Sequence, residues 1–111
     1  MELSDSGKAN FCYSTSDNYD DVFHIGLGEV LCKADPKLVY CGLFEQGEKI
    51  RAIVYAGEDI SKEKSAGEIV KRISQILGGA GGGSPKFAQG GGIDKSKKED
   101  AIKNAKSMII E

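Results

Sequence analysis

Residues 78–92 read Gly-Gly-Ala-Gly-Gly-Gly-Ser-Pro-Lys-Phe-Ala-Gln-Gly-Gly-Gly and hold eight of the 15 glycines in this 111-residue chain. A flexible linker is the usual explanation for such a composition. Only 19 residues follow Gly92, too few to form a stable domain of their own. We therefore expect the glycine stretch to belong to a fold, where glycine allows positive φ and lets a neighbouring backbone or a phosphate come close.

Two kinds of nucleotide-binding loop also contain clustered glycines. A Walker loop ends in Gly-Lys-Ser/Thr, whereas the lysine of this stretch, Lys86, stands between Pro85 and Phe87. A dinucleotide-binding loop leads from a strand into a helix, whereas this stretch follows a predicted helix. The sequence therefore excludes both loops.

A predicted helix stands on each side of the stretch. Residues 65–68 (Ser-Ala-Gly-Glu) have the form of a capping box, and apolar residues then recur at helical spacing over residues 69–77, up to Gly78. Residues 96–99 (Ser-Lys-Lys-Glu) repeat the capping form before a second apolar stripe over residues 101–109. We expect two amphipathic helices, the second ending close to the C-terminus.

The N-terminal half predicts strands and one more helix. Residues 9–14 are typical of a strand, and residues 20–34 have helical apolar spacing that should end before Pro36. Within that helix, we attribute Gly26 and Gly28 to close packing against a sheet.

Residues 38–44 and 50–56 are two apolar runs joined by a polar tetrapeptide, which indicates a β-hairpin. Because the two runs are almost continuously apolar, we expect helices to cover both faces of these strands. The predicted fold class is α/β (α+β): a small mixed sheet of about four strands packed with three helices, with the glycine-rich segment between the last two helices.

The composition indicates one globular domain over residues 1–111. Hydrophobic residues make up 40% and charged residues 29% of the chain, and no apolar run approaches the length of a membrane span. The N-terminus lacks a basic and then apolar signal region. We therefore expect a cytoplasmic location and no contact with a membrane.

The cysteines do not indicate a disulfide framework or a metal site. Cys12, Cys32 and Cys41 are odd in number and form no Cys-x-x-Cys pair, which favours reduced and buried thiols. A zinc site is a poor interpretation, because these cysteines and His24 lack ligand spacing. A cysteine nucleophile paired with His24 would need a tertiary contact that no local pattern supports.

Charge is distributed unevenly along the chain. Residues 1–48 carry a net charge of −6 and residues 49–111 carry +4, which allows the C-terminal half to face a polyanion. A pI near 5.5 is low for a dedicated nucleic-acid-binding domain. We therefore expect any contact with RNA to be local.

The element order over residues 65–105 resembles the DHHA1 domain, in the form found at the C-terminus of alanyl-tRNA synthetases. There, an Ala-Gly-Glu helix start and a glycine-rich segment ending in Ala-Gln-Gly-Gly recur, as residues 66–68 and 88–91 do here. Those relatives often carry an Arg-Pro-Asp-like step after the first glycines, whereas this chain has Ser84-Pro85-Lys86. The role of these three positions is therefore open.

The resemblance implies a non-catalytic fragment of a longer synthetase, an accessory domain that binds the outer corner of the alanine-specific tRNA. It would help to present this tRNA to the aminoacylation and editing sites of the parent enzyme, whose catalytic and editing domains would be its other partners. No cofactor and no DNA are expected.

Two alternatives remain. DHHA1 domains also form the substrate-binding half of DHH-type phosphoesterases and exonucleases, where a histidine typically follows the glycines; here Ser84 follows them. A self-association module would use the apolar helix faces, which are explained more simply as core.

We expect tRNA contacts from the glycine stretch and from the lysines and arginine around it, since residues 62–98 hold eight basic and three acidic side chains. Phe87 is a candidate for base stacking, with core burial as the alternative. The predicted contacts are Gly79, Gly81, Gly82, Gly83, Lys86, Gln89, Gly90, Gly91, Gly92, Lys62, Lys64, Lys71, Arg72 and Lys95, flanked by Lys97 and Lys98.

Overall fold

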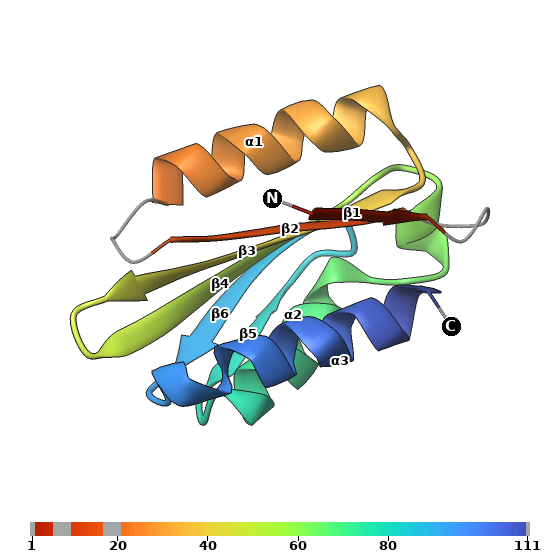
Figure 1. Ribbon diagram of the computed structural model, residues 1–111. Coiled ribbons are helices and arrows are strands. Elements are labelled where there is room, and N and C mark those ends of the chain that lie inside the picture. Colours follow the sequence, from red (N-terminus) through yellow and green to blue (C-terminus); the bar gives the residue numbers. More distant parts are fainter. Residues whose placement is uncertain (1, 6–9, 17–20, 111) are drawn as a thin grey trace.

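The protein is built on one six-stranded sheet with the strand order β1-β2-β3-β4-β6-β5 (Figure 1). The computed structural model describes residues 2–5, 10–16 and 21–110. The elements in chain order are β1 (Glu2–Asp5), β2 (Asn10–Ser16), α1 (Asp21–Ala34), β3 (Leu38–Gln46), β4 (Lys49–Ala56), the 3₁₀ turn η1 (Ile60–Lys62), α2 (Ala66–Ile76), β5 (Ala80–Gly83), β6 (Phe87–Gly92), the 3₁₀ turn η2 (Lys95–Lys97) and α3 (Lys98–Ile110).

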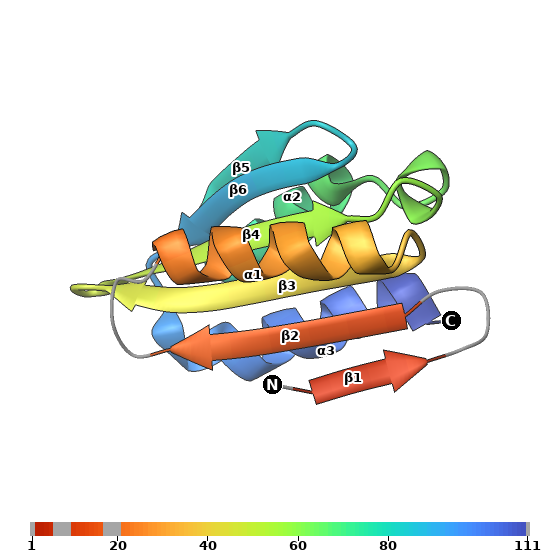
Figure 2. The same cartoon turned by 90° about the horizontal axis from the view of Figure 1, so that it is seen from above.

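Helices lie on both faces of the sheet. α1 lies on one face, and α2 and α3 lie on the other (Figures 1 and 2). β2 and β3 are parallel, so the chain must cross over between them, and α1 forms this crossover. All other neighbouring strands are antiparallel.

The core follows from the apolar runs of β3 and β4. Residues 38–44 are all buried, because their side chains alternate between the two helical layers. Toward α2 and α3, Val39, Cys41 and Leu43 pack with residues such as Ile69 and Ile73 of α2.

Toward α1, Leu38 and Tyr40 pack with Cys12 and Cys32. On α1, a methyl group at Gly28 would lie 2.6 Å from Cδ2 of Tyr55, which confirms close packing of this glycine against the sheet. Gly26 is different, since nothing lies within 4 Å of the corresponding position.

The predicted mixed sheet and its three helices are confirmed. The sheet is larger than expected, because the glycine stretch forms two strands, β5 and β6, and residues 2–5 form β1. Ala9 and Asp20, the predicted first residues of the first strand and the first helix, lie outside the described residues. In the part of the chain that the structure describes, no helix is long and apolar enough to cross a membrane.

Candidate functional site

The turn between β5 and β6 consists of Ser84, Pro85, Lys86 and Phe87. The N–H of Ser84 donates to the carbonyl of Phe87 (2.9 Å), and the N–H of Phe87 donates to Oγ of Ser84 (3.1 Å). Proline at the second position presets the φ that such a turn requires. The Ser84-Pro85-Lys86 step, whose role the sequence left open, therefore builds this turn.

The same turn caps α2. The N–H of Ala66 donates to the carbonyl of Pro85 (2.8 Å), and that of Gly67 donates to the carbonyl of Ser84 (3.1 Å). Ser65 is the N-cap residue, but its side chain makes no capping hydrogen bond. The predicted helix start is confirmed, and the predicted side-chain cap is wrong because two carbonyls of the turn take its place.

Several glycines of the stretch bring α2 close to the hairpin. A methyl group at Gly90 would lie 2.3 Å from Oγ of Ser74 on α2, and one at Gly81 would lie 2.8 Å from the same atom. Ser74 Oγ also accepts the N–H of Gly91 (3.1 Å). Gly90 and Gly91 are buried, and the absence of a side chain at these positions lets α2 and the β5–β6 hairpin pack closely.

Gly79 and Gly92 make similar close contacts near the C-terminal end of α2. A methyl group at Gly92 would lie 2.1 Å from the carbonyl oxygen of Leu77, and one at Gly79 would lie 2.1 Å from that of Gly91. Gly82 is exposed and has nothing within 4 Å of the corresponding position. Of the predicted glycine contacts, Gly82 therefore has the most room for a ligand.

α1 covers β3 and β4 but leaves β5 and β6 uncovered on its side of the sheet (Figure 2). The strand register aligns Tyr55 with Phe87, Ile53 with Gln89 and Gly82, and Arg51 with Gly91 and Ala80 on this side. We call Arg51, Gly82, Phe87 and Gln89 the open sheet face. Gln89 and Gly82 are exposed, and Arg51 and Phe87 are half-buried.

Base stacking and core burial were the two roles predicted for Phe87, and its environment is intermediate between them. Its ring centroid is 4.5 Å from that of Tyr55, so one side is packed, while the residue remains half-buried. Arg51 was not predicted as a contact, because it stands within an apolar run. The alternation of β4 could have identified it, since Ile50 and Ala52 face the core on the other side.

The basic residues predicted to contact tRNA lie at several separate sites on the surface and not in one cluster. Lys71 lines a shallow hollow of about 310 Å³ together with Gly81, Gly82 and Gly83. Lys64 lines an adjoining hollow at the start of α2, and Lys86 lines a groove beside α1. Lys62 and Arg72 are exposed on η1 and α2, and they line none of these three hollows.

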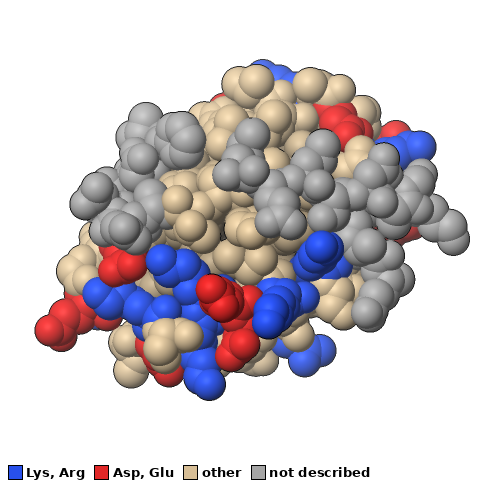
Figure 3. All heavy atoms as spheres, in the orientation of Figure 1, with Lys and Arg blue, Asp and Glu red and all other residues tan. Residues whose placement is uncertain are grey.

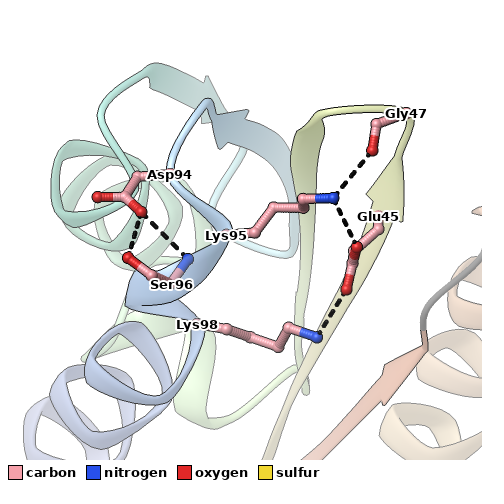
Figure 4. Close-up of polar contacts among 6 residues, drawn as sticks. All are labelled: Glu45, Gly47, Asp94, Lys95, Ser96 and Lys98. Atoms are coloured by element: carbon pink, nitrogen blue, oxygen red, sulfur yellow. Dashed lines mark hydrogen bonds and ion pairs between the residues drawn. The ribbon is translucent and has the colours of Figure 1, made fainter.

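Lys95 and Lys98 are held by Glu45 at the other end of β6 from Lys86 (Figure 4). Their Nζ atoms lie 3.0 and 3.3 Å from the Glu45 carboxylate, and Lys95 also donates to the carbonyl of Gly47 (3.2 Å). Hydrogen bonds from the two lysines lower the pKa of Glu45. Lys95 thus ties the β3–β4 turn to η2, just before α3.

The entry into α3 also differs from the predicted capping box. Asp94 caps η2, because its carboxylate accepts the N–H of Ser96 and its hydroxyl (Figure 4). Lys97 pairs with Asp100 at 3.8 Å. In the face shown by Figure 3, basic and acidic side chains are interleaved over the lower part of the molecule, where α3 lies in Figure 1.

The three cysteines are free and buried, as predicted. Burial raises the pKa of the Cys32 and Cys41 thiols to about 12 and also raises that of Cys12. His24 is fully buried, with Nδ1 2.7 Å from the Tyr40 hydroxyl and 3.2 Å from Ser14 Oγ. Cys12, Cys32 and His24 therefore belong to the α1 side of the sheet and Cys41 to the side of α2 and α3, and burial of the three cysteines disfavours the reactive thiolate form.

Nor do the described residues bring together three His, Cys, Asp or Glu side chains that could hold a metal ion.

Comparison with known proteins adds a family, relatives and a fold. The family model described as "DHHA1 domain" matches residues 9–111. The chain is 50% identical over 103 residues to an alanine–tRNA ligase of Nitrosopumilus maritimus, covering 93% of this chain and 11% of that protein. It is 42% identical over 92 residues to an alanine–tRNA ligase of Cenarchaeum symbiosum, covering 83% and 10%.

Among solved structures, the C-Ala domain of Aquifex aeolicus alanyl-tRNA synthetase matches all of this chain and all of that domain, with a TM-score of 0.91 and 25% identity. The chain therefore spans about a tenth of the length of the two curated relatives named above and the full length of this solved domain.

Proposed function

This chain belongs to the DHHA1 domain family, and from that premise we propose that it is the tRNA-binding accessory domain of an alanine–tRNA ligase. It grips the outer corner of the alanine-specific tRNA and supports aminoacylation and editing by the parent enzyme. Its partners are the tRNA and the catalytic and editing domains of that enzyme, in the cytoplasm. The chain forms one domain of that longer protein.

The observation that carries the proposal is the open sheet face. Gly82 leaves the backbone of β5 accessible to a sugar-phosphate chain, because no side chain covers it. The Arg51 guanidinium suits a phosphate, the Gln89 amide suits a 2′-hydroxyl or a base edge, and the Phe87 ring suits stacking. One surface therefore carries a cationic, a hydrogen-bonding and an aromatic side chain, the three kinds of group that contact phosphates, sugar or base edges, and exposed bases.

Electrostatics support a local contact. In the described part of the chain, Arg51, Lys71 and Lys86 form no ion pair, whereas Lys95 and Lys98 are paired with Glu45. Cations without a carboxylate partner can neutralise phosphates and release counterions. We therefore expect Arg51, Lys71 and Lys86 to contribute more to RNA affinity than Lys95.

Arg51→Gln tests the proposal, with fluorescence anisotropy of labelled tRNA specific for alanine as the measurement. We expect weaker binding. The slope of the logarithm of affinity against the logarithm of salt concentration should also become shallower by about one, because one phosphate contact is lost. Lys103→Gln removes the same charge from the exposed side of α3 and should leave affinity unchanged. Equal effects of the two substitutions would show that the open sheet face does not bind tRNA.

The phosphoesterase alternative is not favoured. The relatives named above are alanine–tRNA ligases. In addition, the position where those enzymes typically carry a histidine is Ser84 here, and its hydroxyl accepts the N–H of Phe87 in the β5–β6 turn.

A further inference from the structure

A groove of about 350 Å³ lies between the C-terminal half of α1 and the end of β4. Tyr55 and Lys86 line it, and Tyr55 contacts Phe87 of the open sheet face with a centroid separation of 4.5 Å. The groove therefore adjoins the proposed RNA surface. Its volume lies at the small end of the range of ligand sites.

The floor of the groove is uncharged and partly aromatic. Tyr55 lies beneath α1, where Gly28 leaves room for its ring. Burial and the nearby Glu29 raise the pKa of Tyr55, and burial raises the pKa of Cys32 to about 12, so both groups keep their protons. A flat ring can rest on such a floor without desolvating a charge.

The rim of the groove carries two kinds of charge. Glu29 and Glu58 present carboxylates, which only accept hydrogen bonds, and Lys33 and Lys86 present ammonium groups, which only donate. Glu29 and Lys33 form an exposed pair at 3.5 Å, and a pair of this kind is weak enough to rearrange. Neither Glu58 nor Lys86 forms an ion pair among the described residues.

A ligand that complements this groove needs a flat ring, adjacent N–H donors on one edge and a negative charge. Guanine offers N1–H and the N2 amino group side by side, whereas adenine places an acceptor beside its amino group. We propose that the groove binds an unstacked guanine nucleotide of RNA, an inference that rests on the proposed tRNA binding. The base lies on Tyr55, Glu58 accepts from its N1–H and N2–H, and Lys33 and Lys86 lie beside the phosphate.

The test is an NMR titration of the ¹⁵N-labelled chain with 5′-GMP, 5′-IMP and 5′-AMP. IMP lacks only the 2-amino group of GMP, so the comparison isolates that hydrogen bond. We expect GMP to shift the amide signals of Cys32 and Gly57 saturably, with about tenfold weaker binding of IMP and AMP. Equal affinities for GMP and AMP, or no saturable shift of these amides, would overturn the proposal.

Glu58→Gln supplies the protein-side test. Glu58 is exposed, so the substitution should not perturb the fold, and we expect GMP to bind about tenfold more weakly. Glu48→Gln, at an exposed position of the β3–β4 turn, should leave GMP affinity unchanged. The same loss in both variants would also overturn the assignment.

The two proposals fail separately. If tRNA binding responds to Arg51→Gln but GMP does not perturb the groove, the guanine site is wrong and the tRNA surface stands. If GMP binds selectively but the chain has no affinity for tRNA, the guanine site stands and the proposed function is wrong.

Discussion

The N–H of Phe87 donates to the hydroxyl of Ser84, and so the carbonyl of Ser84 remains available for the first turn of α2. The Ser84 side chain thus affects both the turn of the β5–β6 hairpin and the first turn of α2, where Gly67 lies 17 positions earlier in the sequence. The hairpin and α2 are coupled through this residue.

Ser84→Ala should lower the free energy of unfolding by about 1 kcal/mol, because the N–H of Phe87 loses its acceptor or takes the carbonyl that caps α2. Ser65→Ala is the matched control and should cost less than about 0.5 kcal/mol, because the Ser65 side chain makes no capping bond. Urea denaturation measures both. A larger cost for Ser65→Ala would contradict the capping arrangement.

Gly91→Ala should destabilise the protein by about 2 kcal/mol or more. Gly91 has φ 154°, and a methyl group there would lie 2.2 Å from the carbonyl oxygen of Ile50. Gly82→Ala should change stability by less than about 0.5 kcal/mol, because the site is open. Circular dichroism during urea titration distinguishes the two, and equal effects would argue against the described packing.

Gly82→Val should weaken tRNA binding while the circular dichroism spectrum stays native, because the branched side chain would cover the exposed backbone of β5. Gly91 cannot serve for this test, because its replacement changes the fold itself. Unchanged tRNA affinity of Gly82→Val would remove β5 from the proposed surface.

Glu45 should make stability depend on pH. Its pKa is lowered in the folded state by hydrogen bonds from Lys95 and Lys98, so its contribution is complete above the unfolded-state pKa and is lost as pH falls through the folded-state pKa. Urea denaturation at neutral pH and at about pH 3 should show a smaller pH dependence for Glu45→Gln than for the unaltered chain. If Glu45→Gln altered the pH dependence of stability no more than Glu48→Gln does, this role of Glu45 would be contradicted.

Cys32 and Cys41 should resist alkylation by iodoacetamide at about pH 8 in the folded protein, because thiolate is the reactive form and both pKa values are about 12. Their reaction should become fast in concentrated urea, and mass spectrometry after timed quenching follows each cysteine. Rapid alkylation of either cysteine without denaturant would show that burial does not control these thiols.

Local patterns predicted most of the fold. The apolar runs of residues 38–44 and 50–56 became β3 and β4, and the Ser-x-x-Glu form located the start of α2. The strands β5 and β6 were not predicted, because glycine is rare in strands and nothing local favours pairing. β4 on one side of β6 and Ser74 behind it supply that stabilisation from distant parts of the chain.

The candidate site was less predictable than the fold. Lys95 stands three residues after Gly92, but the chain turns there and directs this lysine to Glu45. Arg51 is 40 positions before Gly91 in sequence and beside it in the sheet. Only the pairing of β4 with β6 brings such residues together, and local patterns in a single sequence do not reveal the register of that pairing.

β5 is the last strand of the sheet, and its outer backbone edge has no partner strand in the described structure. Exposed edges of this kind invite pairing with another chain, and many proteins prevent it with charged residues or proline. Ala80–Gly83 has neither, but three glycines lose much conformational entropy on joining a strand and offer no side chains for a cross-strand ladder. The composition that keeps this edge accessible thus also discourages aggregation through it.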